Sequence, residues 1–137
     1  MRTLLLIGIL AFTCSCGTRK NIKSNSEIPQ EFFQRWKLDY GIAHNQKISG
    51  LPQSPINDYE FKQNGEYIIY KQGETFITGT WEYHKEEKVI YTKRSDGELN
   101  GKITNIKPQS ILLIPAGRDI EGTPFEKFQF YYIPKIE

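Results

Sequence analysis

The sequence predicts an all-β protein whose eight antiparallel strands close into an up-and-down barrel. Short segments alternate between apolar and polar residues, tight-turn residues separate them, and no apolar pattern of helical length lies between them. Parallel strands need long crossover connections, so their absence favours antiparallel pairing. Closure of the sheet removes the two free edges that an open sheet would expose. A two-sheet sandwich is the alternative.

The clearest part of this pattern is residues 58–83, which we expect to form three strands. Asn64-Gly65 separates the first two strands, and this pair is typical of a type I′ turn, in which both central residues have positive φ. Gln72-Gly73 supplies the second turn. The segment is therefore predicted to be an antiparallel meander.

The remaining elements follow from the same signals. Pro29 begins a segment, residues 29–33, that we expect to form one helical turn with two phenylalanines on the core. The loops 44–57 and 116–124 either cover a barrel mouth or only bridge strands. Further strands are expected at residues 35–43, 88–93, 98–106, 110–115 and 125–133, the first with Trp36, Leu38, Tyr40 and Ile42 on one face.

The N-terminus has the pattern of a signal peptide. Arg2 precedes the apolar run 4–12, which is too short to span a bilayer. The end of the run resembles the lipobox of a bacterial lipoprotein, with Ser15 directly before Cys16. Cys16 is thus the predicted site of lipid attachment. Cys14 is the alternative acceptor, and a cleaved signal without lipid is the other alternative.

The chain is therefore predicted to consist of a signal peptide (1–15), a flexible tether (16–28) and a barrel domain (29–137). Acyl chains on Cys16, palmitate among them, would hold the protein stably on a membrane. Gly17 follows the cysteine with no acidic residue beside it. By resemblance to lipoprotein sorting, this favours the bacterial outer membrane and a position facing the periplasm.

Composition excludes several classes of function. A formal net charge of +2 gives no electrostatic footprint for nucleic acid. Both cysteines lie at the end of the leader, so no disulfide or thiolate metal site is expected in the barrel. His44 and His84 lack acidic partners at metal-ligand spacing, and no nucleophile elbow or phosphate-binding loop is present. We therefore expect no metal, no cofactor and no enzymatic activity.

Three motifs carry a family resemblance, namely Arg35-Trp36-Lys37-Leu38, the hairpin pattern from Phe61 to Tyr67, and Gly79-Thr80-Trp81. They resemble the lipocalin-like domains of lipoproteins of the Bacteroidetes. The resemblance covers residues 33–134 and departs at Gln34, where the family usually has glycine. It implies a lipocalin-like barrel and, as its function, the binding of a small ligand.

Large aromatic residues are the candidates for lining such a barrel. An eight-stranded barrel is either filled by side chains or wide enough for one small ligand. The first hypothesis is therefore a module that binds a small apolar ligand. A solid-core lipoprotein acting on an unidentified protein partner is the second, and an enzyme built around His44 or His84 is the third. The expected inward-facing residues are Trp36, Tyr40, Phe61, Trp81, Tyr83, Phe128, Phe130 and Tyr132.

Overall fold

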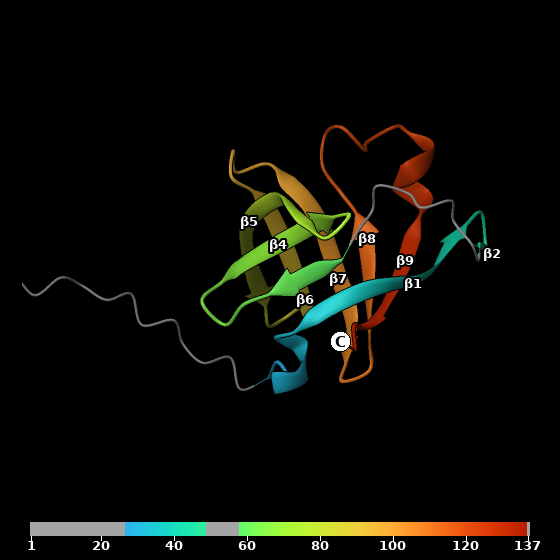
Figure 1. The fold of residues 1–137 in the computed structure, drawn as a ribbon. Helices are drawn as coiled ribbons and strands as arrows, with labels where there is room; N and C mark the ends of the chain where they lie inside the picture. The colour runs from blue at the N-terminus through green and yellow to red at the C-terminus, as the bar shows by residue number, and fades with distance from the viewer. Residues whose placement is uncertain (1–26, 49–57, 137) are drawn as a thin grey trace, which may run out of the picture.

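The computed structural model describes residues 27–48 and 58–136, which form strands and two short 3-10 helices (Figure 1). The helices are η1 (Gln30–Phe32) and η2 (Pro124–Lys127). Within this part of the chain, no helix has the length and apolarity needed to cross a membrane. The strands are β1 (Arg35–Ala43), β2 (Gln46–Ile48), β3 (Tyr59–Phe61), β4 (Glu66–Lys71), β5 (Glu74–His84), β6 (Val89–Arg94), β7 (Leu99–Lys107), β8 (Ser110–Pro115) and β9 (Gln129–Pro134).

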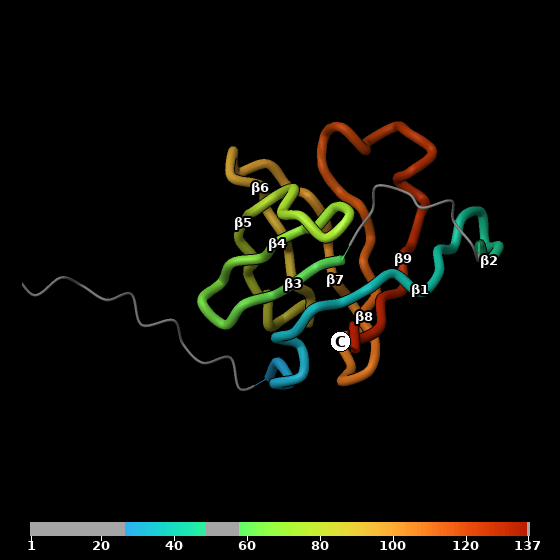
Figure 2. Tube along the Cα trace, viewed as in Figure 1, coloured from blue at the N-terminus to red at the C-terminus, as the bar shows by residue number. Residues whose placement is uncertain are grey.

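The predicted barrel is confirmed. From β3 to β9 each strand pairs with the next in antiparallel fashion, as the trace in Figure 2 shows. β1 pairs with β3 on one side and with β9 on the other, which closes eight strands into a ring. The strand order and closure are those of an up-and-down barrel, the architecture found in lipocalins.

β2 is an addition that the sequence interpretation missed. It lies in the segment expected to be a loop and pairs with the end of β1. His44 (φ 50°) and Asn45 (φ 62°) both have positive φ, as a two-residue type I′ turn requires. The hairpin therefore uses two residues without the glycine that usually signals this turn.

One of the two turns of the meander differs in type from the prediction. Gln72 (φ 54°) and Gly73 (φ 86°) both have positive φ and form the type I′ turn between β4 and β5. At Asn64-Gly65 only Gly65 has positive φ, and its backbone N–H donates to the carbonyl of Lys62 at 3.2 Å. This is the longer hairpin loop built on a type I turn, so the hairpin is correct and its expected turn type is wrong.

Tyr40 does not face the barrel interior as predicted, because β1 contains a bulge. The register with β9 shifts between Leu38 and Tyr40. Beyond the shift, Gly41 and Ala43 are the buried positions of the strand. The Tyr40 ring stacks instead on Tyr131, with centroids 4.6 Å apart, outside the barrel. The extra residue at the bulge reverses the alternation on which the inward orientation depended.

Aromatic side chains close the end of the barrel next to η1. Phe32 is fully buried and stacks on Phe61 at 4.6 Å between ring centroids. Its backbone carbonyl accepts a hydrogen bond from the Trp36 indole at 3.0 Å. The predicted helical turn with phenylalanine docked on the core is thus confirmed. Ile28, which the sequence analysis assigned to the tether, is also buried in this core.

The last strand is shorter than expected. β9 begins at Gln129, because Pro124 opens η2 and Phe125 lies within that helix. Proline is well suited to the first helical position, since its missing N–H has no helical partner there. The predicted signal peptide, with Cys14 and Cys16, lies outside the described residues.

Candidate ligand-binding site

A cavity of about 150 Å³ lies at the barrel mouth that is farthest from η1. The starts of β3, β7 and β9 and the end of β8 meet at this mouth, because adjacent strands run in opposite directions. The segment that connects β8 to β9 supplies the remaining wall. The cavity is lined by Tyr59, Asn100, Leu113, Pro115, Ile120, Phe125 and Phe130.

The cavity walls are mostly apolar, with one polar pair. Leu113 and Phe130 belong to the barrel core, and Ile120 and Phe125 come from the connecting segment. Burial raises the pKa of Tyr59 above its ordinary value, and the neighbouring Asn100 side chain opposes part of that shift. The Tyr59 hydroxyl therefore stays protonated. An apolar chamber with a few placed hydrogen-bonding groups is the usual construction of a small-molecule site.

Two further tyrosines stand behind Tyr59. Its ring lies 6.3 Å from that of Tyr67 and 5.3 Å from that of Tyr132, measured between centroids. Both partners are fully buried, and within the described residues neither of their hydroxyls forms a hydrogen bond. Burial raises the pKa of Tyr67 to about 12 and that of Tyr132 well above its usual range. The core behind Tyr59 thus holds two neutral phenols.

The size of the cavity limits its contents. An apolar cavity of about 150 Å³ is known to accommodate a molecule such as benzene. This chamber therefore suits a single ring or a short branched alkyl group, but it is far too small for haem or a whole fatty acid.

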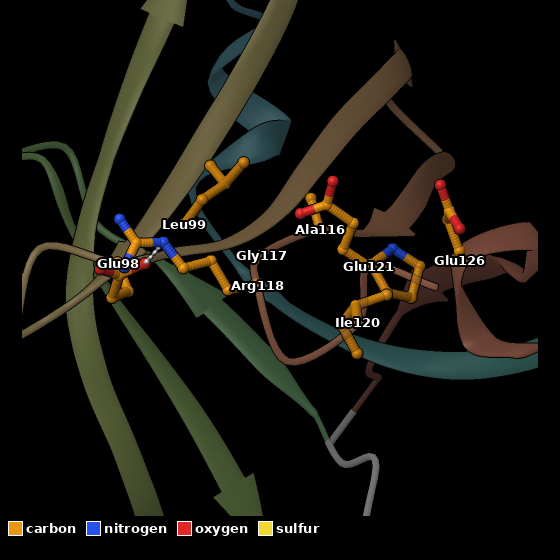
Figure 3. A pocket seen from close by; sticks show the side chains of 9 residues that line it. Glu98, Leu99, Ala116, Gly117, Arg118, Ile120, Glu121 and Glu126 are labelled. Atoms are coloured by element: carbon orange, nitrogen blue, oxygen red, sulfur yellow. Dashed lines mark ion pairs between the residues drawn. The ribbon is translucent and has the colours of Figure 1, made fainter. Parts of the chain in front are cut away.

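A wider pocket of about 420 Å³ opens beside the cavity (Figure 3). The two spaces share Pro115 and Ile120, so they adjoin. We call the smaller space the inner chamber and the larger one the vestibule. The vestibule is lined by Glu98, Leu99, Pro115, Ala116, Gly117, Arg118, Ile120, Glu121 and Glu126.

Four of the residues expected to line a ligand site lie in the aromatic cluster near η1 instead. Trp36 and Phe61 are fully buried there. Trp81 packs edge-on against Phe32, and its indole N–H donates to the carbonyl of Lys62 at 2.9 Å. Tyr83 is partly buried against the same core. Both indole groups are therefore satisfied by the protein, and none of the four residues lines the chamber or the vestibule.

Of the three predicted residues Phe128, Phe130 and Tyr132, Phe130 lines the inner chamber. Phe128 packs edge-on against Phe130 at 6.0 Å, and Tyr132 lies deeper in the core. The expectation missed Tyr59, Asn100 and the chamber residues of the connecting segment. The length of the loop after β8 was the one available signal, since long ordered loops often carry binding residues.

Neither histidine joins this site. His44 is exposed in the turn between β1 and β2. His84 lies at the end of β5, with its ring nitrogens 3.8 Å from carboxylate oxygens of Glu82 and Glu87. Across residues 27–48 and 58–136, no group of three or more His, Cys, Asp or Glu side chains is arranged to hold a metal ion.

Comparisons with protein-family models, with curated proteins and with solved structures find no match to this chain. The assignment of the fold therefore rests on the strand pairing and on the closure between β1 and β9. That arrangement is compatible with a lipocalin-like barrel.

Proposed function

We propose that this chain is a lipid-anchored binding protein whose lipocalin-like barrel holds a small apolar group in the inner chamber. The observation that carries the proposal is the chamber itself, with apolar walls and the Tyr59–Asn100 pair at its side. Near η1 the barrel is packed with large side chains, whereas the inner chamber lies at the opposite mouth. A barrel that is packed at the η1 end and open at the other mouth argues against an interior filled throughout by side chains.

The ligand is held by burial of apolar surface and oriented by one or two hydrogen bonds. Each methylene group that enters the chamber contributes about 0.8 kcal/mol. Tyr59 and Asn100 offer a hydroxyl and an amide to a polar atom of the ligand. The role is binding without chemical change, so a ligand recovered from the complex has the same mass as the ligand that was added.

The binding experiment uses the full-length chain in lipid nanodiscs, with leucine and isoleucine methyl groups labelled for NMR. Leu113 lines the chamber, and Leu112 precedes it on β8 and points to the opposite face of the strand. Phenethyl alcohol, a neutral probe of suitable size, is expected to shift the Leu113 methyl signals in a saturable way and to leave those of Leu112 in place. Ile120→Trp fills the chamber from the connecting segment and is expected to abolish the shift. Equal shifts at both leucines, or none at Leu113, would contradict the proposal.

The proposal also places the protein on the outer membrane through Cys16, as in the Bacteroidetes lipoproteins that its motifs resemble. Metabolic labelling with an alkyne analogue of palmitate tests this point. Label is expected on the wild-type chain and on Cys14→Ser, and it is expected to be lost from Cys16→Ser. Labelled Cys16→Ser would contradict the assignment. Outer-membrane fractionation and resistance to protease added to intact cells are the results expected for a domain that faces the periplasm.

A further inference from the structure

The vestibule differs from the inner chamber in its charge. Glu98, Glu121 and Glu126 line it together with a single cation, Arg118. At neutral pH these side chains leave a formal excess of two negative charges. Figure 3 shows Glu98 and Arg118 on one side of the pocket, with Glu121 and Glu126 on the other.

The two arginines in this region, Arg118 and Arg94, do not neutralise this excess. The Arg118 Nε atom lies 3.8 Å from a carboxylate oxygen of Glu98, and the Arg118 side chain is highly exposed. Arg94 pairs instead with Asp119 at 3.1 Å and with Asp96 at 3.6 Å. Among the described residues, Glu121 and Glu126 form no ion pair within 4 Å. One oxygen of Glu126 accepts a hydrogen bond from the Gly122 backbone at 3.2 Å, which fixes that carboxylate at the pocket wall.

An exposed aromatic ring forms part of the wall of the inner chamber. Phe125 lines the inner chamber and is still 50% exposed, which is high for a residue of this kind. Its ring meets Phe128 edge-on at 5.1 Å. The face of an aromatic ring attracts cations that approach within about 6 Å. A positive group just outside the chamber would therefore meet an aromatic ring as well as carboxylates.

From this arrangement we infer that the ligand is a small cationic amphiphile, with an apolar body in the inner chamber and an amine in the vestibule. The inference rests on the proposed function and adds the charge of the ligand to it. The apolar body is about the size of one ring, because the chamber holds no more. A short linker joins it to a primary or quaternary ammonium group, since the two spaces adjoin at Pro115 and Ile120. The amine then approaches Glu121 and Glu126, and carboxylate ligands are repelled.

The test compares three probes that share a phenyl ring and a short chain, namely phenethylamine, phenethyl alcohol and phenylacetate. Each is titrated into the full-length chain in zwitterionic nanodiscs, with Leu113 methyl shifts as the measure of binding. The amine is expected to bind roughly three- to tenfold more tightly than the alcohol, because ion pairs between exposed charges contribute little free energy. Phenylacetate is expected to bind most weakly of the three. The preference is expected to vanish in ~1 M salt, where the Debye length is about 3 Å.

Charge-neutral variants identify the carboxylates responsible. Glu121→Gln combined with Glu126→Gln is expected to equalise the amine and the alcohol without weakening binding of the alcohol. Glu86→Gln is the matched control, because it removes an exposed charge from the β5–β6 turn at the other end of the barrel. If amine and alcohol bind equally to the wild type, or if the double variant keeps the preference, the inference is overturned and the proposed function stands. If no probe shifts Leu113, the inference and the proposed function both fail.

Discussion

Replacing Phe32 with alanine should destabilise the barrel more than any exposed aromatic substitution. Phe32 is fully buried at the closed end, and its ring contacts four other aromatic rings. The centroid distances are 4.6 Å to Phe61, 5.6 Å to Phe33, 5.9 Å to Trp81 and 6.5 Å to Trp36. Removal of the ring leaves all four without their common partner.

The size of the effect follows from burial and ring packing. A buried phenylalanine changed to alanine costs about 3–5 kcal/mol, and aromatic pairs contribute about 0.5–1.5 kcal/mol each beyond burial. Because η1 is short and lies at the end of the barrel, it can shift to fill part of the space. We therefore expect a loss of about 4 kcal/mol, equivalent to a fall in Tm of about 15–30 °C for a domain of this size.

Urea unfolding of the full-length chain in nonionic micelles, followed by far-UV circular dichroism, measures this loss. Phe76→Ala is the matched control, since Phe76 is 56% exposed on β5 and its removal should change stability by less than about 0.5 kcal/mol. The urea m-value should be unchanged, because the barrel still unfolds as a unit. If Phe32→Ala were as mild as Phe76→Ala, η1 would not close the barrel and the account of a solid base would be wrong.

Three other predictions concern the buried interior. Gly79→Ala should cost at least about 2 kcal/mol in urea unfolding, because the new Cβ would lie 2.2 Å from the Lys93 carbonyl oxygen and 2.5 Å from the Tyr67 ring; a change under about 0.5 kcal/mol would contradict this contact. Tyr132→Phe should leave the free energy of unfolding unchanged or raise it by up to about 2 kcal/mol, since its buried hydroxyl has no partner among the described residues; a clear loss of stability would reveal a partner. Because burial raises the pKa of Tyr67 from 10.0 to about 12, the folded chain retains a proton that the unfolded chain releases above pH 10. This contribution to stability is complete below pH 10 and is lost as the pH rises towards 12, so unfolding free energies measured across that range should fall less steeply in Tyr67→Phe; identical slopes would refute it.

The sequence predicts the strands well because their signals are local. Alternation and turn residues define the hairpins from β3 to β8 without reference to the rest of the chain, whereas the β1–β2 hairpin lacks the glycine signal and was missed. Pro29 with its two phenylalanines indicates the helical turn that docks on the core. Closure of the barrel could be predicted because an open sheet of eight antiparallel strands would leave two strand edges unpaired.

The site could not be predicted in the same way. The prediction that Tyr40 points into the barrel is wrong because β1 contains a bulge. That bulge arises in the pairing of β1 with β9, which lies far along the sequence. The inner chamber is a space left between side chains of β3, β7, β8, β9 and the connecting segment, so its residues share no motif. Trp36 and Trp81 were candidates for lining a ligand site because of their size. Large rings can equally fill the core of a barrel, as these two do.

Native mass spectrometry of the full-length chain, purified from its own cells beside the Ile120→Trp variant, would show whether the inner chamber carries a ligand. We expect an added mass on the wild type that is lost on denaturation, has the size of a one-ring amine and is absent from the variant. A wild-type chain with no added mass, or the same added mass on both chains, would contradict a ligand held in the inner chamber.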